Sequence, residues 1–285
     1  MNFRTLLLAS AAVMVATGAS AKSFTDFTNP FALPTKGNVY SETKVQTTRL
    51  TFDDGKEDVT GKEFYASEEV MLGVGENTAL VGYIGNTFDA YSDDEDTLDL
   101  NNDHNFDYGF GVRYNHDFGK VLTQVGVMYR TMDEQSFYGQ DHETENDRWT
   151  KGVEATVKVG YTTDCGLTPY TSFKVAGDID SNNNEQRYSW FVGAHKMWEK
   201  TAVDFGVRYD FGKSVEDMYL PNDEAEGDGN NEAFYLQGSV DHYVTDNFTV
   251  GAYGEYFLGG DNNPVVSYKD IEHNYTVGLA AKVLF

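Results

Sequence analysis

The stretch that decides the fold is Asp270–Phe285, which reads D-I-E-H-N-Y-T-V-G-L-A-A-K-V-L-F. From Tyr275 onward, alternate residues form one apolar face: Tyr275, Val277, Leu279, Ala281, Val283 and Phe285. The opposite face carries small or polar residues, apart from Leu284. An alternation with period two over this length predicts a β-strand with one apolar side. The fold then depends on whether that side meets a protein core or a lipid bilayer.

The beginning of the chain has the pattern of a secretory signal peptide. Arg4 precedes an apolar run over residues 6–15, and small residues lead to an A-x-A site that ends at Ala21. This order predicts export and cleavage after residue 21, and the apolar run is too short to span a membrane. Residues 22–36 contain two prolines, and we expect them to form an irregular periplasmic lead-in. Residues 37–285 are expected to form the folded part.

Composition excludes several classes of function. The formal net charge is -25, with 21 basic and 46 acidic side chains, which argues against binding to nucleic acids or to anionic membrane surfaces. The single cysteine, Cys165, cannot form an internal disulfide. The chain beyond the signal peptide has no run of 18 apolar residues, so no transmembrane helix is expected. A mean hydropathy of -0.50 remains compatible with membrane strands, because alternating strands average to neutral values.

The rest of the chain reads as a series of strands separated by turns. We expect twelve antiparallel strands, although ten to fourteen fit the pattern. Their predicted ranges are 37–52, 62–75, 79–91, 106–117, 120–132, 149–163, 168–179, 186–198, 201–212, 232–244, 248–258 and 270–285. Short connections alternate with long, mostly acidic ones. This alternation is typical of an outer-membrane barrel with short periplasmic turns and long external loops.

Aromatic residues gather at the predicted strand ends, and this distribution favours lipid as the medium. Tyrosine and tryptophan prefer membrane interfaces because they have an apolar body and a polar tip. The expected external ends carry Tyr108, Tyr129, Trp149, Trp190, Tyr209, Phe234, Tyr256 and Tyr275, and the periplasmic ends carry Tyr114, Tyr161, Trp198, Phe248 and Phe285. Mid-strand positions on the same face are aliphatic, as a hydrocarbon band requires.

The opposite strand face carries polar and charged residues. In a soluble sandwich these residues would be solvated, and in a barrel they would line the lumen. The candidates for lining the lumen are Arg113, Arg130, Glu154, Lys158, Lys174, Asp204, Arg208, Asp241, Glu255 and Lys282. The strands expected over 37–52 and 79–91 alternate poorly, so their inward and outward faces are not predicted.

With these features, the chain resembles a Gram-negative outer-membrane β-barrel protein, and its strand number is similar to that of monomeric twelve-stranded, porin-like barrels. The resemblance implies an all-β transmembrane antiparallel barrel located in the outer membrane. It also implies that Tyr275, Val277, Leu279, Ala281, Val283 and Phe285 form the signal read by the barrel-assembly machinery. Outer-membrane lipid and lipopolysaccharide would surround a monomer.

Catalytic and metal-binding patterns are weak in this sequence. The six histidines show no paired metal spacing, and Ser189 has no histidine assignable beside it for hydrolysis. We therefore expect neither an enzyme nor a bound cofactor. The carboxylates of Asp93, Asp94, Glu95 and Asp96 are weak candidates for a divalent cation. A solvated acidic loop is the favoured interpretation of that run.

Two functions remain open from the sequence. The first is a porin-like channel through which small hydrophilic solutes diffuse passively, because twelve strands lie between filled eight-stranded barrels and wide porins. The second is a structural or surface-interaction barrel with a closed lumen and acidic external loops. The shape of the lumen separates them.

The terminal aromatic residue provides a test of the assembly signal. Deletion of Phe285 should reduce insertion of the protein into the outer membrane before it affects any transport, because the strand end would lose its recognition residue. The folded fraction can be measured by heat-modifiable gel mobility of outer-membrane preparations. Normal insertion of the shortened chain would contradict the assignment.

Overall fold

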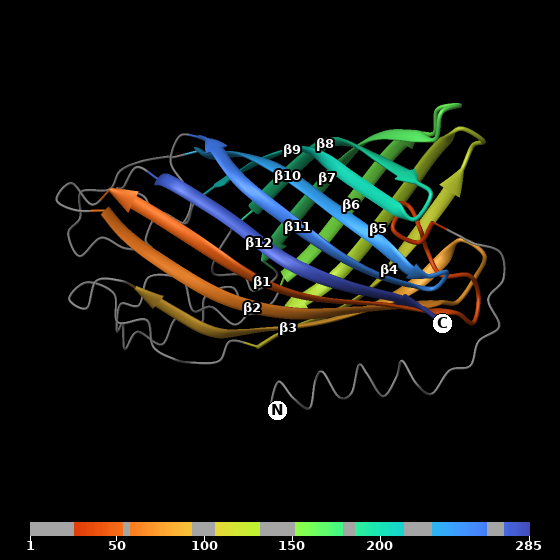
Figure 1. Cartoon of the computed structure of the whole chain (residues 1–285), viewed down its shortest axis with the longest axis horizontal. Helices are drawn as coiled ribbons and strands as arrows, with labels where there is room; N and C mark the ends of the chain where they lie inside the picture. The colour runs from red at the N-terminus through yellow and green to blue at the C-terminus, as the bar shows by residue number, and fades with distance from the viewer. Residues whose placement is uncertain are drawn as a thin grey trace.

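The protein folds into a closed antiparallel barrel of twelve strands in a computed structural model, which describes residues 26–53, 58–92, 106–131, 152–178, 186–213, 230–260 and 271–285 (Figure 1). Each strand pairs with its sequence neighbours, and β1 pairs with β12. The strands are β1 Val39–Asp53, β2 Asp58–Gly73, β3 Thr78–Ser92, β4 Phe106–Asp117, β5 Val121–Thr131, β6 Gly152–Tyr161, β7 Leu167–Asp178, β8 Gln186–Trp198, β9 Thr201–Lys213, β10 Asn230–Thr245, β11 Phe248–Gly259 and β12 Ile271–Leu284. In the described residues, no helix is long and apolar enough to cross a membrane.

The twelve-stranded barrel predicted from the sequence is confirmed. The largest difference in bounds is at β2, which begins at Asp58 rather than at residue 62. Five short turns lie together at one end of the barrel, which also holds the C-terminus; β10 and β11, for example, are joined by Asp246 and Asn247 alone. We call it the periplasmic end, after the side on which short turns are expected. Most of the expected long loops, including Asp93–Asp96 and Trp149, lie outside the described residues.

The first and last strands close the barrel. The register places Val45 opposite Leu279 and Thr47 opposite Val277. At the periplasmic end, Val39 N donates to Phe285 O at 3.1 Å, and Phe285 N donates to Val39 O at 2.7 Å. Backbone groups that would otherwise be open edges are therefore paired, as a strand surrounded by hydrocarbon requires.

The structure also decides the facing of β1, which the sequence pattern left open. Glu42 and Lys44 point into the lumen, whereas Ser41 and Thr43 share the outer face with Val45. The two hydroxyl groups donate hydrogen bonds to the carboxylate of Glu68 on β2, which lies opposite Thr43. Outward polar residues thus satisfy one another within the wall, and this is why β1 lacks a clean apolar alternation.

The outer surface is aliphatic in the middle and aromatic toward the ends. Val127, Val192 and Leu279 are exposed near the middle of their strands. On the outer ends of β8, β9 and β10, four rings stack in a row, with centroid separations of 5.0, 5.0 and 4.5 Å: Tyr188, Phe211, Tyr209 and Phe234. Tyr161 and Trp198 are exposed at the opposite end. This distribution suits a hydrocarbon band between two interfaces.

Aromatic side chains inside the barrel lie against glycines of the wall. A Cβ atom at Gly206 would lie 2.4 Å from the Phe191 ring and 2.4 Å from Val192 O, and one at Gly193 would lie 2.5 Å from the same ring. The Tyr253 ring covers Gly278 in the same manner, at 2.5 Å from the position of a Cβ. These glycines let large rings lie flat on the wall, which keeps the lumen from being filled.

Substitution of Gly206 tests this packing. Gly206→Ala should destabilise the barrel by about 1–3 kcal/mol, because the added methyl group overlaps the Phe191 ring and a backbone oxygen. The midpoint of urea unfolding, followed by tryptophan fluorescence, measures the effect. Gly126→Ala is the matched control on the same inner face, since its Cβ would come no closer than 3.4 Å to a neighbour. Equal midpoints for the two variants would count against the packing role.

Candidate functional site

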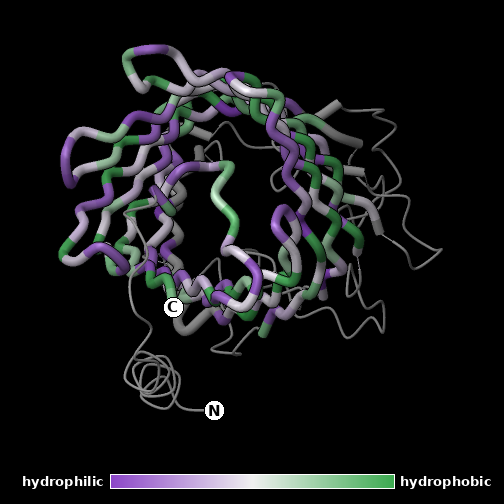
Figure 2. The backbone as a smooth tube through the Cα atoms, turned by 90° about the vertical axis from the view of Figure 1, so that its right-hand side faces the viewer, coloured by the Kyte–Doolittle hydropathy of each residue, from purple (hydrophilic) through white to green (hydrophobic). Residues whose placement is uncertain are grey.

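The N-terminal segment Asp26–Asn38 lies inside the periplasmic end of the barrel, and Figure 2 shows chain crossing the interior of the ring of strands. We call this segment the plug. It has turns but no helix or strand, and Asn38 N donates to Thr35 O at 2.9 Å just before β1 begins. The sequence predicted an irregular lead-in here but not its position in the lumen.

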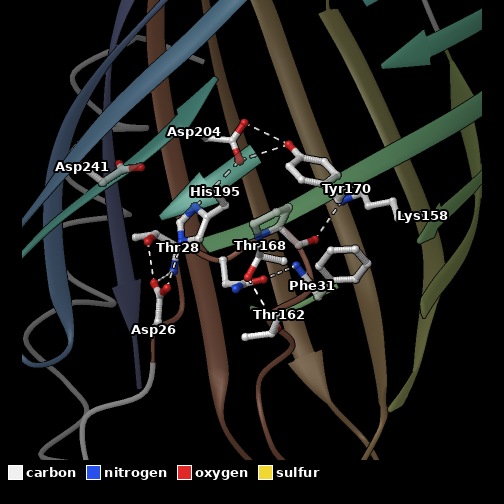
Figure 3. Close-up of polar contacts among 12 residues, drawn as sticks. Asp26, Thr28, Phe31, Lys158, Thr162, Thr168, Tyr170, His195, Asp204 and Asp241 are labelled. Carbon is white, nitrogen blue, oxygen red and sulfur yellow. Dashed lines mark hydrogen bonds and ion pairs between the residues drawn. The ribbon is translucent and has the colours of Figure 1, made fainter. Parts of the chain in front are cut away.

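A polar network centred on Asp26 attaches the plug to the wall (Figure 3). Asp26 Oδ2 lies 2.8 Å from Nε2 of His195 on β8, and Asp26 Oδ1 accepts a hydrogen bond of 3.0 Å from the Tyr243 hydroxyl on β10. The other ring nitrogen of His195, Nδ1, faces Asp204 Oδ2 on β9 at 3.7 Å. His195 is 2 % exposed, so two carboxylates flank a buried imidazole.

The ionisation of Asp26 reflects this network. Burial by itself would raise the pKa of the Asp26 carboxyl, but hydrogen bonds with His195 and Thr28 outweigh it, so the pKa lies below its ordinary value. The ionised form of Asp26 is therefore the one that holds the plug.

Two further hydrogen bonds and two aromatic rings complete the attachment. Lys158 Nζ on β6 donates to Pro30 O at 3.0 Å, and the Asn115 amide on β4 donates to Phe31 O. The Phe31 ring packs edge-on against Tyr170 on β7, with centroids 5.8 Å apart. Phe27 contacts Tyr40 and Tyr243, which belong to a buried apolar cluster at this end of the barrel. The plug is thus packed and hydrogen-bonded on several sides.

Described residues line three cavities along the lumen. A vestibule of about 850 Å³ at the periplasmic end is lined by plug residues together with Asn115, Asn247 and Phe285. A mid-lumen cavity of about 540 Å³ has walls from β1 and from β6 to β12, including Lys44, Lys158 and Arg208. A third cavity of about 250 Å³ lies beside it against β2 to β7. Phe31 lines the vestibule and packs on Tyr170, which lines the mid-lumen cavity, so the plug stands between the two.

Charged side chains on the inner face form ion pairs that follow the wall. Arg113 on β4 binds Glu69 on β2 through two contacts of 2.7 Å, and Arg208 on β9 binds Glu255 on β11 at 2.6 and 2.9 Å. Lys282 on β12 lies 2.7 Å from Asp241 on β10. Each of these pairs joins strands only two apart in the barrel order.

The structure places all ten sequence-predicted lumen residues at the two inner cavities. Arg113, Arg130, Glu154 and Lys174 line the smaller cavity, whereas Asp204, Arg208, Asp241, Glu255 and Lys282 line the mid-lumen cavity, and Lys158 lines both. Inner residues that the sequence pattern did not predict include Asp26, Glu42, Lys44 and Glu69. Those on β1 and β2 were hidden because the outer faces of these strands also carry polar residues.

The other predicted sites have different outcomes. Tyr275, Val277, Leu279, Ala281 and Val283 share the outer face of β12, whose last residue precedes Phe285 at the closure of the barrel. Their role as an assembly signal stays a prediction. The weak cation candidates Asp93, Asp94, Glu95 and Asp96 lie outside the described residues. Within the described ranges, no group of three or more His, Cys, Asp or Glu side chains is arranged to hold a metal ion.

Comparison with known proteins identifies the fold. No family model matches the sequence, and no curated protein matches it. An outer membrane channel from Pseudomonas putida F1 aligns with 94% of this chain and 100% of its own, with a TM-score of 0.62 and 9% sequence identity. The translocator domain of the autotransporter NalP from Neisseria meningitidis aligns with a TM-score of 0.51 and 11% identity, over 98% of this chain and 97% of its own.

The chain has the fold of an outer-membrane β-barrel. At these identities the similarity concerns architecture alone, and the two structures differ in function: one is a channel and the other is an autotransporter translocator domain. The lumen residues described above therefore have to support the functional argument.

The Asp26 network predicts how the plug responds to acid. Because the pKa of Asp26 is lowered in the folded protein, its contribution is complete above its ordinary value of about 3.9 and is lost as the pH falls through the lowered value. Hydrogen–deuterium exchange of residues 26–36, corrected for intrinsic rates, should be similar at pH 6 and about pH 4 and should rise as the pH falls from about 4 to about 2. Complete loss of the charge-assisted hydrogen bond should lower the free energy that holds the plug in the barrel by about 1.5–3 kcal/mol.

The control for this prediction is Asp26→Asn, which cannot ionise. Its plug should exchange faster than that of the wild type at pH 6 and should show little additional change at about pH 2. If the wild-type plug exchanges equally at both pH values, ionised Asp26 does not hold it.

Proposed function

We propose that this protein is a porin-like channel of the Gram-negative outer membrane, through which small hydrophilic solutes diffuse passively past the plug. In this proposal the chain is exported with a signal peptide over residues 1–21, inserted by the barrel-assembly machinery and surrounded by outer-membrane lipid and lipopolysaccharide. It acts as a monomer and performs no catalysis.

The observation that carries the proposal is the mid-lumen cavity of about 540 Å³. Its size falls in the range of pockets that accept small solutes. Its lining contains charges of both signs, such as Lys44 and Glu255, together with hydroxyl groups such as Ser172. A polar surface of this kind can replace the hydrogen bonds between a solute and water, so the free energy needed to desolvate the solute during passage is small.

The direction of the ion pairs also supports an open lumen. Pairs such as Arg113–Glu69 and Arg208–Glu255 join strands that are two apart, so they lie along the wall rather than across the interior. The rings of Phe191 and Tyr253 pack directly against glycines of the wall. These large side chains therefore pack along the wall and leave space in the centre of the lumen.

The plug favours a second candidate function, a structural or surface-interaction barrel with a closed lumen. Phe27 and Phe31 are 5% and 6% exposed, so the plug is packed as tightly as a core segment. If it stays seated, the periplasmic end is narrowed permanently. The two candidates therefore differ in whether ions pass around the seated plug.

Planar-bilayer recording of the refolded mature chain tests the channel. Discrete conductance steps are expected from the wild type, and larger steps are expected after deletion of residues 26–36, because the deletion joins the vestibule to the mid-lumen cavity. Phe31→Ala, which removes only one plug contact, should give an intermediate increase.

The control for the deletion is a variant that changes the chain outside the lumen. Lys120→Gln removes an exposed cation that pairs with Asp164 in the periplasmic turns, and its conductance should match that of the wild type. If the wild-type barrel shows no conductance steps, the channel function is rejected. If the deletion variant also shows none, the closed structural barrel is favoured.

A further inference from the structure

Two lysines on the inner wall differ from the other cations of the lumen. Arg113, Arg130, Arg208, Lys44 and Lys282 each lie within 4.0 Å of a carboxylate oxygen. In the part of the chain that the structure describes, no carboxylate oxygen lies within that distance of Lys158 Nζ or Lys174 Nζ. Among the described residues, these two positive charges therefore have no close counterion on their side of the lumen.

The two lysines are neighbours on the same patch of wall. On the β6–β7 pair, Lys158 lies opposite Ser172, and Lys174 lies opposite Thr156, so the lysines occupy diagonal positions. Diagonal positions on one sheet face are about 7–8 Å apart at the backbone, within the reach of long side chains. Both ammonium groups can therefore approach a single small ligand.

Between these lysines and Arg113, the inner wall has a position without a side chain. Gly126 on β5 lies opposite Arg113 on one side and opposite Thr156 on the other. A side chain at Gly126 would lie against the Arg113 stem, whereas the glycine leaves that space empty. The result is the cavity of about 250 Å³, whose lining includes Gly126, Thr156 and both lysines.

Donor groups at this position remain available. An ammonium group has three N–H donors, and Lys158 uses one of them on Pro30 O. Lys174 makes no hydrogen bond or ion pair with a described residue, and the Thr156 hydroxyl offers a further donor. A carboxylate ligand would accept charge-assisted hydrogen bonds from both lysines and offset the cost of withdrawing their charges from bulk water.

We propose that Lys158 and Lys174, with Thr156 and Gly126 beside them, form an anion subsite on the β6–β7 wall that binds a small dicarboxylate. Two lysines with no described carboxylate oxygen within 4.0 Å match the two negative charges of such a ligand. Glu69 and Glu154 line the same cavity and repel anions of higher charge density, such as phosphate. The claim that a transported solute passes through this subsite rests on the proposed channel function. The claim that the subsite binds a ligand does not.

Direct binding to the refolded mature chain tests the subsite. Isothermal titration of the detergent-solubilised barrel with succinate should show saturable binding that weakens when the salt concentration is raised from about 20 mM to about 0.5 M. The neutral isostere succinamide should not bind, and inorganic phosphate should bind more weakly than succinate. Absence of saturable succinate binding would overturn the proposal.

Three variants assign the binding to these lysines. Lys174→Gln should weaken succinate binding about tenfold, as expected for the loss of one charge-assisted hydrogen bond, and Lys174→Arg should retain most of the affinity. Lys44→Gln is the matched control, since it removes a lumenal lysine that is already paired with Glu42, and its affinity should stay within about twofold of the wild type. Each variant is first checked for wild-type heat-modifiable mobility. Equal losses in Lys174→Gln and Lys44→Gln would overturn the subsite in favour of a general effect of lumen charge.

Bilayer recording separates this subsite from the proposed function. A barrel that binds succinate at Lys174 but conducts no ions keeps the subsite and rejects the channel. A barrel that conducts but neither binds succinate nor shows reduced current in its presence keeps the channel and rejects the subsite.

Discussion

The pairing of β1 with β12 is the constraint on which the rest of this structure depends. It joins Val39 to Phe285 through two backbone hydrogen bonds and aligns Val45 with Leu279 along the seam. Without it, both strands would present unpaired backbone groups to hydrocarbon, where no water can satisfy them. Closure also creates an enclosed interior, so every inward charge on twelve strands depends on this seam for its environment.

The closed wall lets a short segment narrow the interior at one end. The plug is bound by residues from β4, β6, β7, β8 and β10, including Asn115, Lys158 and His195, and these strands surround it only because the sheet is closed. The neighbouring charges are arranged as pairs along the wall. Their arrangement stabilises the barrel and leaves cavities between the pairs, and Lys158 links the plug to both inner cavities. Plug and lumen thus form one connected site.

Much of the fold could be predicted because alternation in these strands has a single physical cause. Val127 and Leu279 face outward, whereas Arg130 and Lys282 face inward. Because successive side chains of a strand point to opposite faces, the position of a residue in the alternation predicts the face on which it lies. The prediction failed to assign β1 because Ser41 and Thr43 point outward to bind Glu68, an interaction between residues 25 and 27 positions apart. Local patterns cannot show that a polar residue has found its partner on another strand.

By itself, the sequence determined that this chain forms a barrel of about twelve strands and which charges on most of its strands face inward. Both follow from the period-two geometry of a strand, which is a local property. Only the tertiary structure decided that residues 26–38 enter the lumen, that Arg113 and Arg208 pair with carboxylates, and that no described carboxylate lies within 4.0 Å of Lys158 or Lys174. Those outcomes depend on the register between strands and on which residues meet across the closed interior, and neither is encoded in any one stretch of the chain.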